Sequence, residues 1–217
     1  MKKPGELWRA YREADLRARS RLIAVFTMIA NFVTAAGKVA IGIVSSSFFV
    51  LISGAYSAGV GACKQIFYRG AARAADREEE WKYYRNIAVG LLLSGLFYGV
   101  SMVRYFFSPD VVRYDTIVGI SIAAFAFLDL GLAIAGLVRS GRRKDLLLSG
   151  LKTVNFSGAL AAIALTQAAL LSFSGEEGVS PAVLQGNAAM GILVGAVSCL
   201  LALRMLVRFG KRDRLQG

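Results

Sequence analysis

Six long apolar stretches, separated by short polar and charged segments, dominate the pattern of this sequence. Each has about 20 residues or more, and a helix of that length crosses the roughly 30 Å of bilayer hydrocarbon. Lipid offers no partner to backbone N–H and C=O groups, so a spanning segment must pair them internally as a helix. The pattern predicts an all-α membrane protein whose six transmembrane helices occupy residues 22–208. The stretches lie at 22–45, 48–68, 86–107, 114–138, 146–173 and 184–207.

The segments between and around the apolar stretches also carry structural signals. Only Ser46 and Ser47 separate the first two stretches, which predicts a tight helical hairpin. Residues 69–85 are highly charged and lack proline, so we expect them to extend the second and third helices into the cytoplasm. Residues 1–21 mix basic side chains with apolar ones at helical spacing, which favours either an amphipathic helix on the inner membrane surface or a partly ordered basic tail. Residues 209–217 are predicted to be a short cytoplasmic tail.

The basic residues indicate the orientation. The chain has a formal net charge of +12, and its Lys and Arg residues gather near the N-terminus, in 69–85, in 139–144 and after residue 203. The connections that alternate with these carry few basic residues. Cytoplasmic loops are enriched in Lys and Arg, so both termini are predicted to lie in the cytoplasm, with the chain in the plasma membrane. Because the charge lies in short clusters between apolar stretches, lipid is the expected partner and nucleic acid is not.

The composition excludes several kinds of chemistry. The sequence contains no histidine, and its two cysteines, Cys63 and Cys199, lie inside apolar stretches. Neither a disulfide framework nor a cysteine metal cluster is expected. There is also no phosphate-binding loop and no pair of neighbouring carboxylates inside the apolar stretches. We therefore predict neither an enzyme nor a bound cofactor.

Charged side chains at membrane depth are costly and usually face the interior of a bundle. Asp129 and Lys152 lie in consecutive stretches at similar distances from the cytoplasmic end, so we expect them to pair. Three interpretations remain open: a structural ion pair between two helices, a Lys152 that extends alone toward the cytoplasm, and a polar transport site. Other polar residues at comparable depth are further candidates for that site, namely Asn31, Lys38, Tyr56, Thr153, Asn155 and Ser157.

Residues 38–57 carry a family resemblance. Lys38 is followed by the turn Ser45-Ser-Ser47 and by the run Leu51-Ile-Ser-Gly-Ala-Tyr56-Ser. This arrangement resembles the start of the cation diffusion facilitator family, and the likeness extends over about 22–110, including the aromatic-rich Trp81–Arg85. The resemblance implies a six-helix bundle with both termini inside, working as a homodimer.

The family's metal-binding residues are missing, however. That family binds its divalent ion with an Asp or His pair four residues apart on the second helix and a similar pair on the fifth. The matching positions here are Tyr56 and Val60, and Thr153 and Ser157. Zinc takes about four nitrogen, sulfur or carboxylate ligands, so no metal site is expected.

Three functions follow as hypotheses. The first is a divergent transporter of a small cation or small molecule, in which Asp129 binds a cation or proton, Lys152 is its counter-ion, and Tyr56 and Asn155 are polar contacts. The second is a protein that kept the fold and lost the site, acting as a regulatory or scaffold membrane protein. The third is a substrate-capture subunit of a larger importer, favoured by the small residues of the first stretch.

Overall fold

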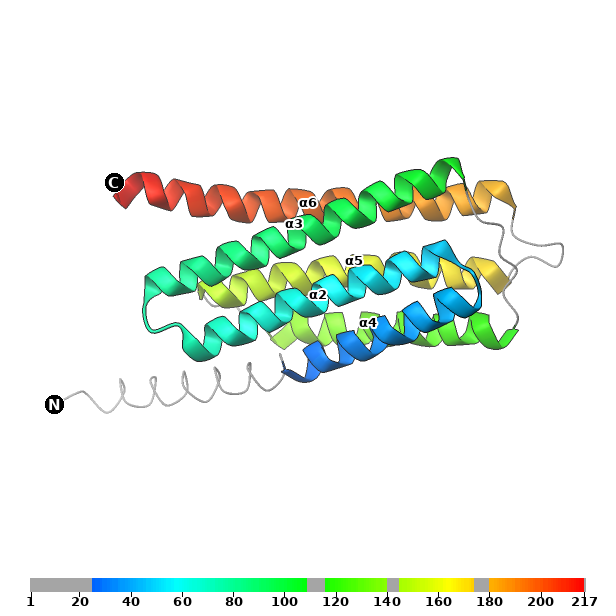
Figure 1. The fold of residues 1–217 in the computed structure, drawn as a ribbon, viewed down its shortest axis with the longest axis horizontal. Helices are drawn as coiled ribbons and strands as arrows, with labels where there is room; N and C mark the ends of the chain where they lie inside the picture. The colour runs from blue at the N-terminus through cyan, green and yellow to red at the C-terminus, as the bar shows by residue number, and fades with distance from the viewer. Residues whose placement is uncertain (1–24, 109–115, 140–144, 174–179, 217) are drawn as a thin grey trace.

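The computed structural model describes residues 25–108, 116–139, 145–173 and 180–216, which form six helices and no strand (Figure 1). All six predicted apolar stretches are confirmed as helical over the residues described. The predicted segment 1–21 lies outside these residues. So do residues 109–115 and 174–179, which form most of the connections on the side predicted to face away from the cytoplasm. The helices are the first helix Val25–Val44, α2 Phe48–Arg73, α3 Arg77–Phe107, α4 Thr116–Arg139, α5 Leu146–Phe173 and α6 Pro181–Gln216.

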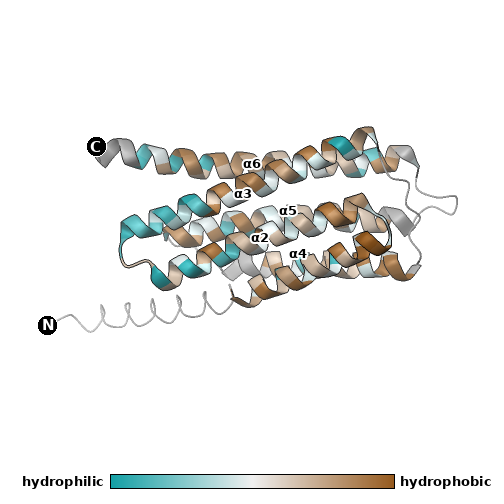
Figure 2. Cartoon of the chain, in the orientation of Figure 1, coloured by the Kyte–Doolittle hydropathy of each residue, from teal (hydrophilic) through white to brown (hydrophobic). Residues whose placement is uncertain are grey.

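The outer surface of the bundle is that of a multi-pass membrane protein. Five helices, all except α2, are long and apolar enough to cross a membrane. Large apolar side chains stand exposed along them, with Val44 82% and Phe107 78% exposed. Soluble monomers rarely expose so much contiguous apolar surface. Figure 2 shows apolar residues along the helices and hydrophilic residues gathered where α2 meets α3.

Helix α2 lies at the centre of the bundle. It packs against α3 and α5 and against the first helix, where a Cβ on Gly54 would meet Val39 Cγ2 at 2.9 Å. Tyr68 is its one exposed large hydrophobic side chain. A helix enclosed by other helices needs no lipid-facing apolar stripe. Its polar residues, which lower its hydropathy, can therefore face the interior.

The connection between the first helix and α2 is the predicted tight turn. Ser46 adopts a left-handed conformation with φ 51°. The Ser47 N–H donates to Gly42 O at 2.8 Å, and the Ser46 N–H donates to Ile43 O at 3.1 Å. These two bonds form a Schellman motif, which satisfies the last carbonyls of the first helix. The side chain of Ser47 then caps α2 by accepting from Val50 N.

The charged segment between α2 and α3 is almost entirely helical, as predicted. Only residues 74–76 separate the two helices. Asp76 accepts from Glu79 N at 2.8 Å, and Glu79 accepts from Ala75 N at 2.8 Å, a reciprocal arrangement close to a capping box. The acidic first turn of α3 also favours its dipole.

The predicted C-terminal tail is helical as far as Gln216, as a continuation of α6. Aromatic contacts with the start of α3 explain this extension. The rings of Trp81 and Phe209 lie 6.2 Å apart, and the Arg212 guanidinium lies 5.4 Å from the Trp81 ring. Farther along the same pair of helices, a Cβ on Gly195 would lie 2.6 Å from Gly99 Cα, so the two backbones touch.

Candidate functional site

Asp129, on α4, is the one buried acid among the described residues, and three side chains donate to its carboxylate. Lys38, on the first helix, forms an ion pair with Oδ2. Thr34 Oγ1 donates to Oδ1 at 2.8 Å, and Ser57 Oγ, on α2, donates to Oδ2 at 3.3 Å. Lys38 Nζ also donates to Ser57 Oγ at 2.9 Å. Three helices therefore meet at one charged cluster.

This geometry corrects the predicted partner of Asp129. The carboxylate pairs with Lys38 in place of Lys152, which lies half-buried on α5. The first helix packs closely on α4, because a Cβ on Gly37 would lie 2.4 Å from the Phe125 ring. That approach turns Lys38 toward Asp129. Proximity in the chain between α4 and α5 was therefore the wrong guide to the ion pair.

A second lysine is buried one helix away, and its hydrogen-bond acceptor is an amide oxygen in place of a carboxylate. Lys64, on α2, is 1% exposed, and its Nζ donates to Asn31 Oδ1 at 2.6 Å. Lys38 is paired directly with Asp129, whereas Lys64 interacts with that carboxylate only electrostatically, without a direct bond. With all three groups ionised, the site carries one net positive charge.

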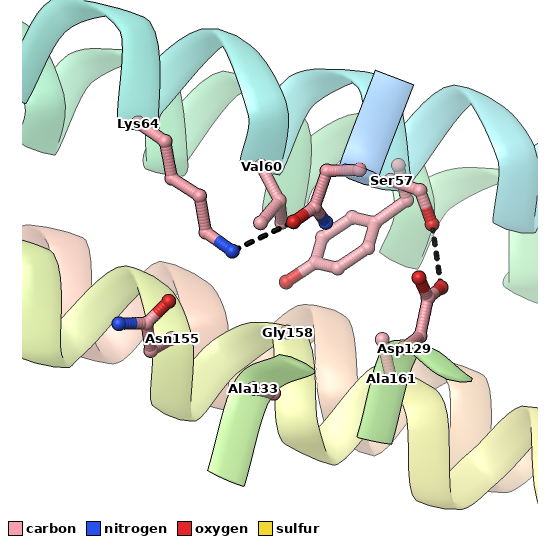
Figure 3. A pocket seen from close by; sticks show the side chains of 10 residues that line it. Ser57, Val60, Lys64, Asp129, Ala133, Asn155, Gly158 and Ala161 are labelled. Carbon is pink, nitrogen blue, oxygen red and sulfur yellow. Dashed lines mark hydrogen bonds between the residues drawn. The ribbon is translucent and has the colours of Figure 1, made fainter. Parts of the chain in front are cut away.

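Lys64 and Asp129 line the same small cavity (Figure 3). The space open to the centre of a water molecule is about 10 Å³, which is room for about one water. From α5, the cavity is lined by Asn155, Gly158 and Ala161. Asn155 is 2% exposed, and its Oδ1 has no hydrogen-bond partner among the described residues. An unpaired polar atom and a charged ammonium thus face one enclosed space.

Three hydroxyl groups form a second polar cluster beside the cavity. Tyr56, which also lines the cavity, has its hydroxyl 2.6 Å from Ser157 Oγ and 2.9 Å from Ser198 Oγ. Ser198 also donates to Val194 O at 2.7 Å. The cluster joins α2, α5 and α6. Tyr56 and Ser157 therefore lie together in the interior.

The α2 positions that the sequence resemblance matched to the metal-binding pair of the cation diffusion facilitator family do line the cavity. Tyr56 and Val60 both contribute to it, whereas Thr153 lines a different groove near the end of the bundle. Among the described residues, no group of three or more His, Cys, Asp or Glu side chains could hold a metal ion. The arrangement provides one carboxylate, two ammonium groups and several hydroxyls and amides.

No family model matches this chain, and no curated protein is significantly similar to it in sequence. The site must therefore be interpreted from its own residues.

Sequence reasoning missed four members of the site, Thr34, Ser57, Lys64 and Ser198. Lys64 lies in a predicted transmembrane stretch at positions i+4 from Val60 and i+8 from Tyr56, so helical spacing alone places it on the cavity face. Thr34 lies one turn before Lys38 and could have been found in the same way. Ser198 has no such signal, because it sits in an apolar stretch without another candidate nearby.

Proposed function

We propose that this protein is a plasma-membrane transporter for a small ion or polar solute, with a bundle like that of the cation diffusion facilitator family. The observation that carries this proposal is the cavity lined by Lys64, Asp129 and the unpartnered Asn155. Buried charges and unpaired polar atoms destabilise a membrane bundle, so a core built only for packing would replace them with apolar side chains. Their concentration at one enclosed point favours a binding site.

The proposed topology has six transmembrane helices with cytoplasmic termini. The 26 residues of α2 would rise roughly 39 Å, which is enough to cross the hydrocarbon. Its central position accounts for its lower hydropathy. The charged ends of α2, α3 and α6 lie at one end of the bundle (Figure 1), and their Lys and Arg residues lead the positive-inside rule to assign that end to the cytoplasm. The family likeness further implies a homodimer.

The charges of the site suggest how it could bind and release an ion. The Lys38 ammonium group is ion-paired with Asp129. A transported cation or proton would therefore have to displace this ammonium from the carboxylate. An anion would instead be attracted to Lys64, whose direct partner is the neutral amide of Asn31 and whose charge Asp129 offsets without a direct bond. Tyr56 supports the proposal that the cavity binds an ion. It lines the cavity at the position where the cation diffusion facilitator family, which the sequence resembles, places a metal ligand.

A thermal-shift titration of the purified protein in detergent tests binding. The panel is Na⁺, K⁺, choline, Zn²⁺, chloride and acetate, each as a salt with an inert counter-ion. A ligand at about 100 times its dissociation constant adds roughly 2.7 kcal/mol of stability. We expect one class of ion to stabilise the protein and Asn155→Leu to abolish that effect. Equal stabilisation of the protein and of Asn155→Leu would contradict the proposed site.

A second candidate is a regulatory or scaffold membrane protein that has the fold without transport. The three donors around Asp129 favour this candidate. A carboxylate that is already fully bonded holds three helices together without needing a ligand. Flux measurements in proteoliposomes separate the two functions. Saturable uptake of the stabilising ion supports transport, and binding without uptake supports the regulatory protein.

A further inference from the structure

A large groove opens between α5 and α6 at the basic end of the bundle. The space within it is about 500 Å³, far more than the central cavity offers. Ser149 and Thr153 line it from α5, one turn apart. Tyr84 of α3, which is 2% exposed, contributes a buried wall.

The groove has a strongly positive lining. Arg204, Arg208 and Lys211 follow one another on a single face of α6, at spacings of four and three residues. Among the described residues that line it, none is acidic. Arg208 interacts electrostatically with the Tyr84 hydroxyl, which places one guanidinium beside this wall. Two guanidinium groups and an ammonium beside the Ser149 hydroxyl form a set of donors suited to phosphate oxygens, whereas Thr153 Oγ1 donates to Ser149 O.

The groove is also amphipathic along α6. Leu201 and Met205 line it beside the cations, and Val207, 57% exposed, continues the apolar surface. Leu201 lies farther from the basic end of the bundle than the three cations do. A free phosphate has no apolar group that could contact these walls. A phospholipid, in contrast, places its acyl chains against apolar side chains and its headgroup against cations.

We infer that this groove binds the headgroup phosphate of an anionic phospholipid from the leaflet at that end. The groove shares no lining residue with the central cavity, so this inference does not depend on the proposed transport function.

Native mass spectrometry of the full-length protein in detergent tests it, with phosphatidylglycerol and phosphatidylcholine of identical acyl chains as probes. The test variant is Arg204→Gln/Arg208→Gln. The control is Arg69→Gln/Arg73→Gln, which removes the same charge from exposed positions on α2 outside the groove. We expect tighter binding of phosphatidylglycerol than of phosphatidylcholine, weakened about 30-fold in the test variant and unchanged in the control.

Three results would overturn the inference: equal binding of both lipids, equal losses in the two double variants, or displacement of phosphatidylglycerol by excess inorganic phosphate. The last result would identify a site for free phosphate. If the double variant does not fold, Lys211→Gln serves instead, because Lys211 is exposed and its replacement should weaken binding about 5-fold.

Discussion

Lys38 and Lys64 are both buried at membrane depth, on neighbouring helices, yet their surroundings differ. Lys38 meets a carboxylate that two further hydroxyl groups also contact. Lys64 meets the amide oxygen of Asn31 and borders a cavity. The first arrangement pairs a buried charge directly with a carboxylate. The second places a charge beside a cavity, where Asp129 offsets it without a direct bond. Stability and binding are therefore expected to reside in different members of one polar site.

The same contrast recurs between two tyrosines whose rings lie 4.8 Å apart. The hydroxyl of Tyr56 contacts two serines, whereas the buried hydroxyl of Tyr98 has no partner among the described residues. The same substitution made at both lysines, and another made at both tyrosines, should reveal which polar groups hold the bundle together.

The largest effect is expected from Asp129→Asn, which leaves the Lys38 ammonium without a counter-charge. Breaking a buried ion pair on one side costs about 3–5 kcal/mol. Reversible unfolding in mixed detergent micelles measures the loss. Adding Lys38→Met should restore most of it, because the double variant leaves neither member of the Lys38–Asp129 pair without its partner. A double variant as unstable as Asp129→Asn would mean that the pair is not what stabilises the cluster.

Matched substitutions of the two lysines compare them directly. Lys38→Met strands the Asp129 carboxylate and should cost about 3 kcal/mol of unfolding free energy. Lys64→Met removes a buried charge and one hydrogen bond together, so its stability should stay within about 1 kcal/mol of the parent. The same unfolding measurement applies to both. Equal losses would refute the distinction between a directly paired lysine and one beside the cavity.

Asn155→Leu should raise stability by about 1 kcal/mol, because a leucine of similar shape replaces an amide with an unsatisfied oxygen. Asn31→Leu is the contrasting variant. It removes the acceptor of Lys64 and should cost about 2 kcal/mol. Thermal unfolding of both variants in one detergent provides the comparison. A loss of stability in Asn155→Leu would indicate that its oxygen is paired in the folded protein.

The smallest effect is expected at the tyrosines. Tyr56→Phe removes two interhelical hydrogen bonds, each worth about 0.6 kcal/mol in membrane proteins, for a loss of about 1 kcal/mol. Tyr98→Phe removes a hydroxyl that has no partner and should leave stability unchanged or slightly higher. Thermal unfolding at matched protein concentration distinguishes them. A larger loss for Tyr98→Phe would reverse the assignment.

Much of the polar site was visible in the sequence as single residues. Helical spacing placed Asn155 near the level of Asp129, and the likeness to the known family drew attention to Tyr56. The sequence did not reveal that Ser57 does more than allow close packing, since its hydroxyl bonds to both charged partners. A serine among small residues gives no signal that distinguishes the two roles.

The sequence by itself determined that the chain forms apolar helices and that Asp129 lies within one of them, because backbone groups in lipid must pair inside their own segment. Only the tertiary structure decided which cation meets Asp129. Depth along a helix can be counted from its ends, but the direction in which a side chain points depends on how neighbouring helices pack. The close approaches at Gly37 and Gly54 set that packing here. They bring Lys38 to the carboxylate of Asp129, 91 residues away in the sequence.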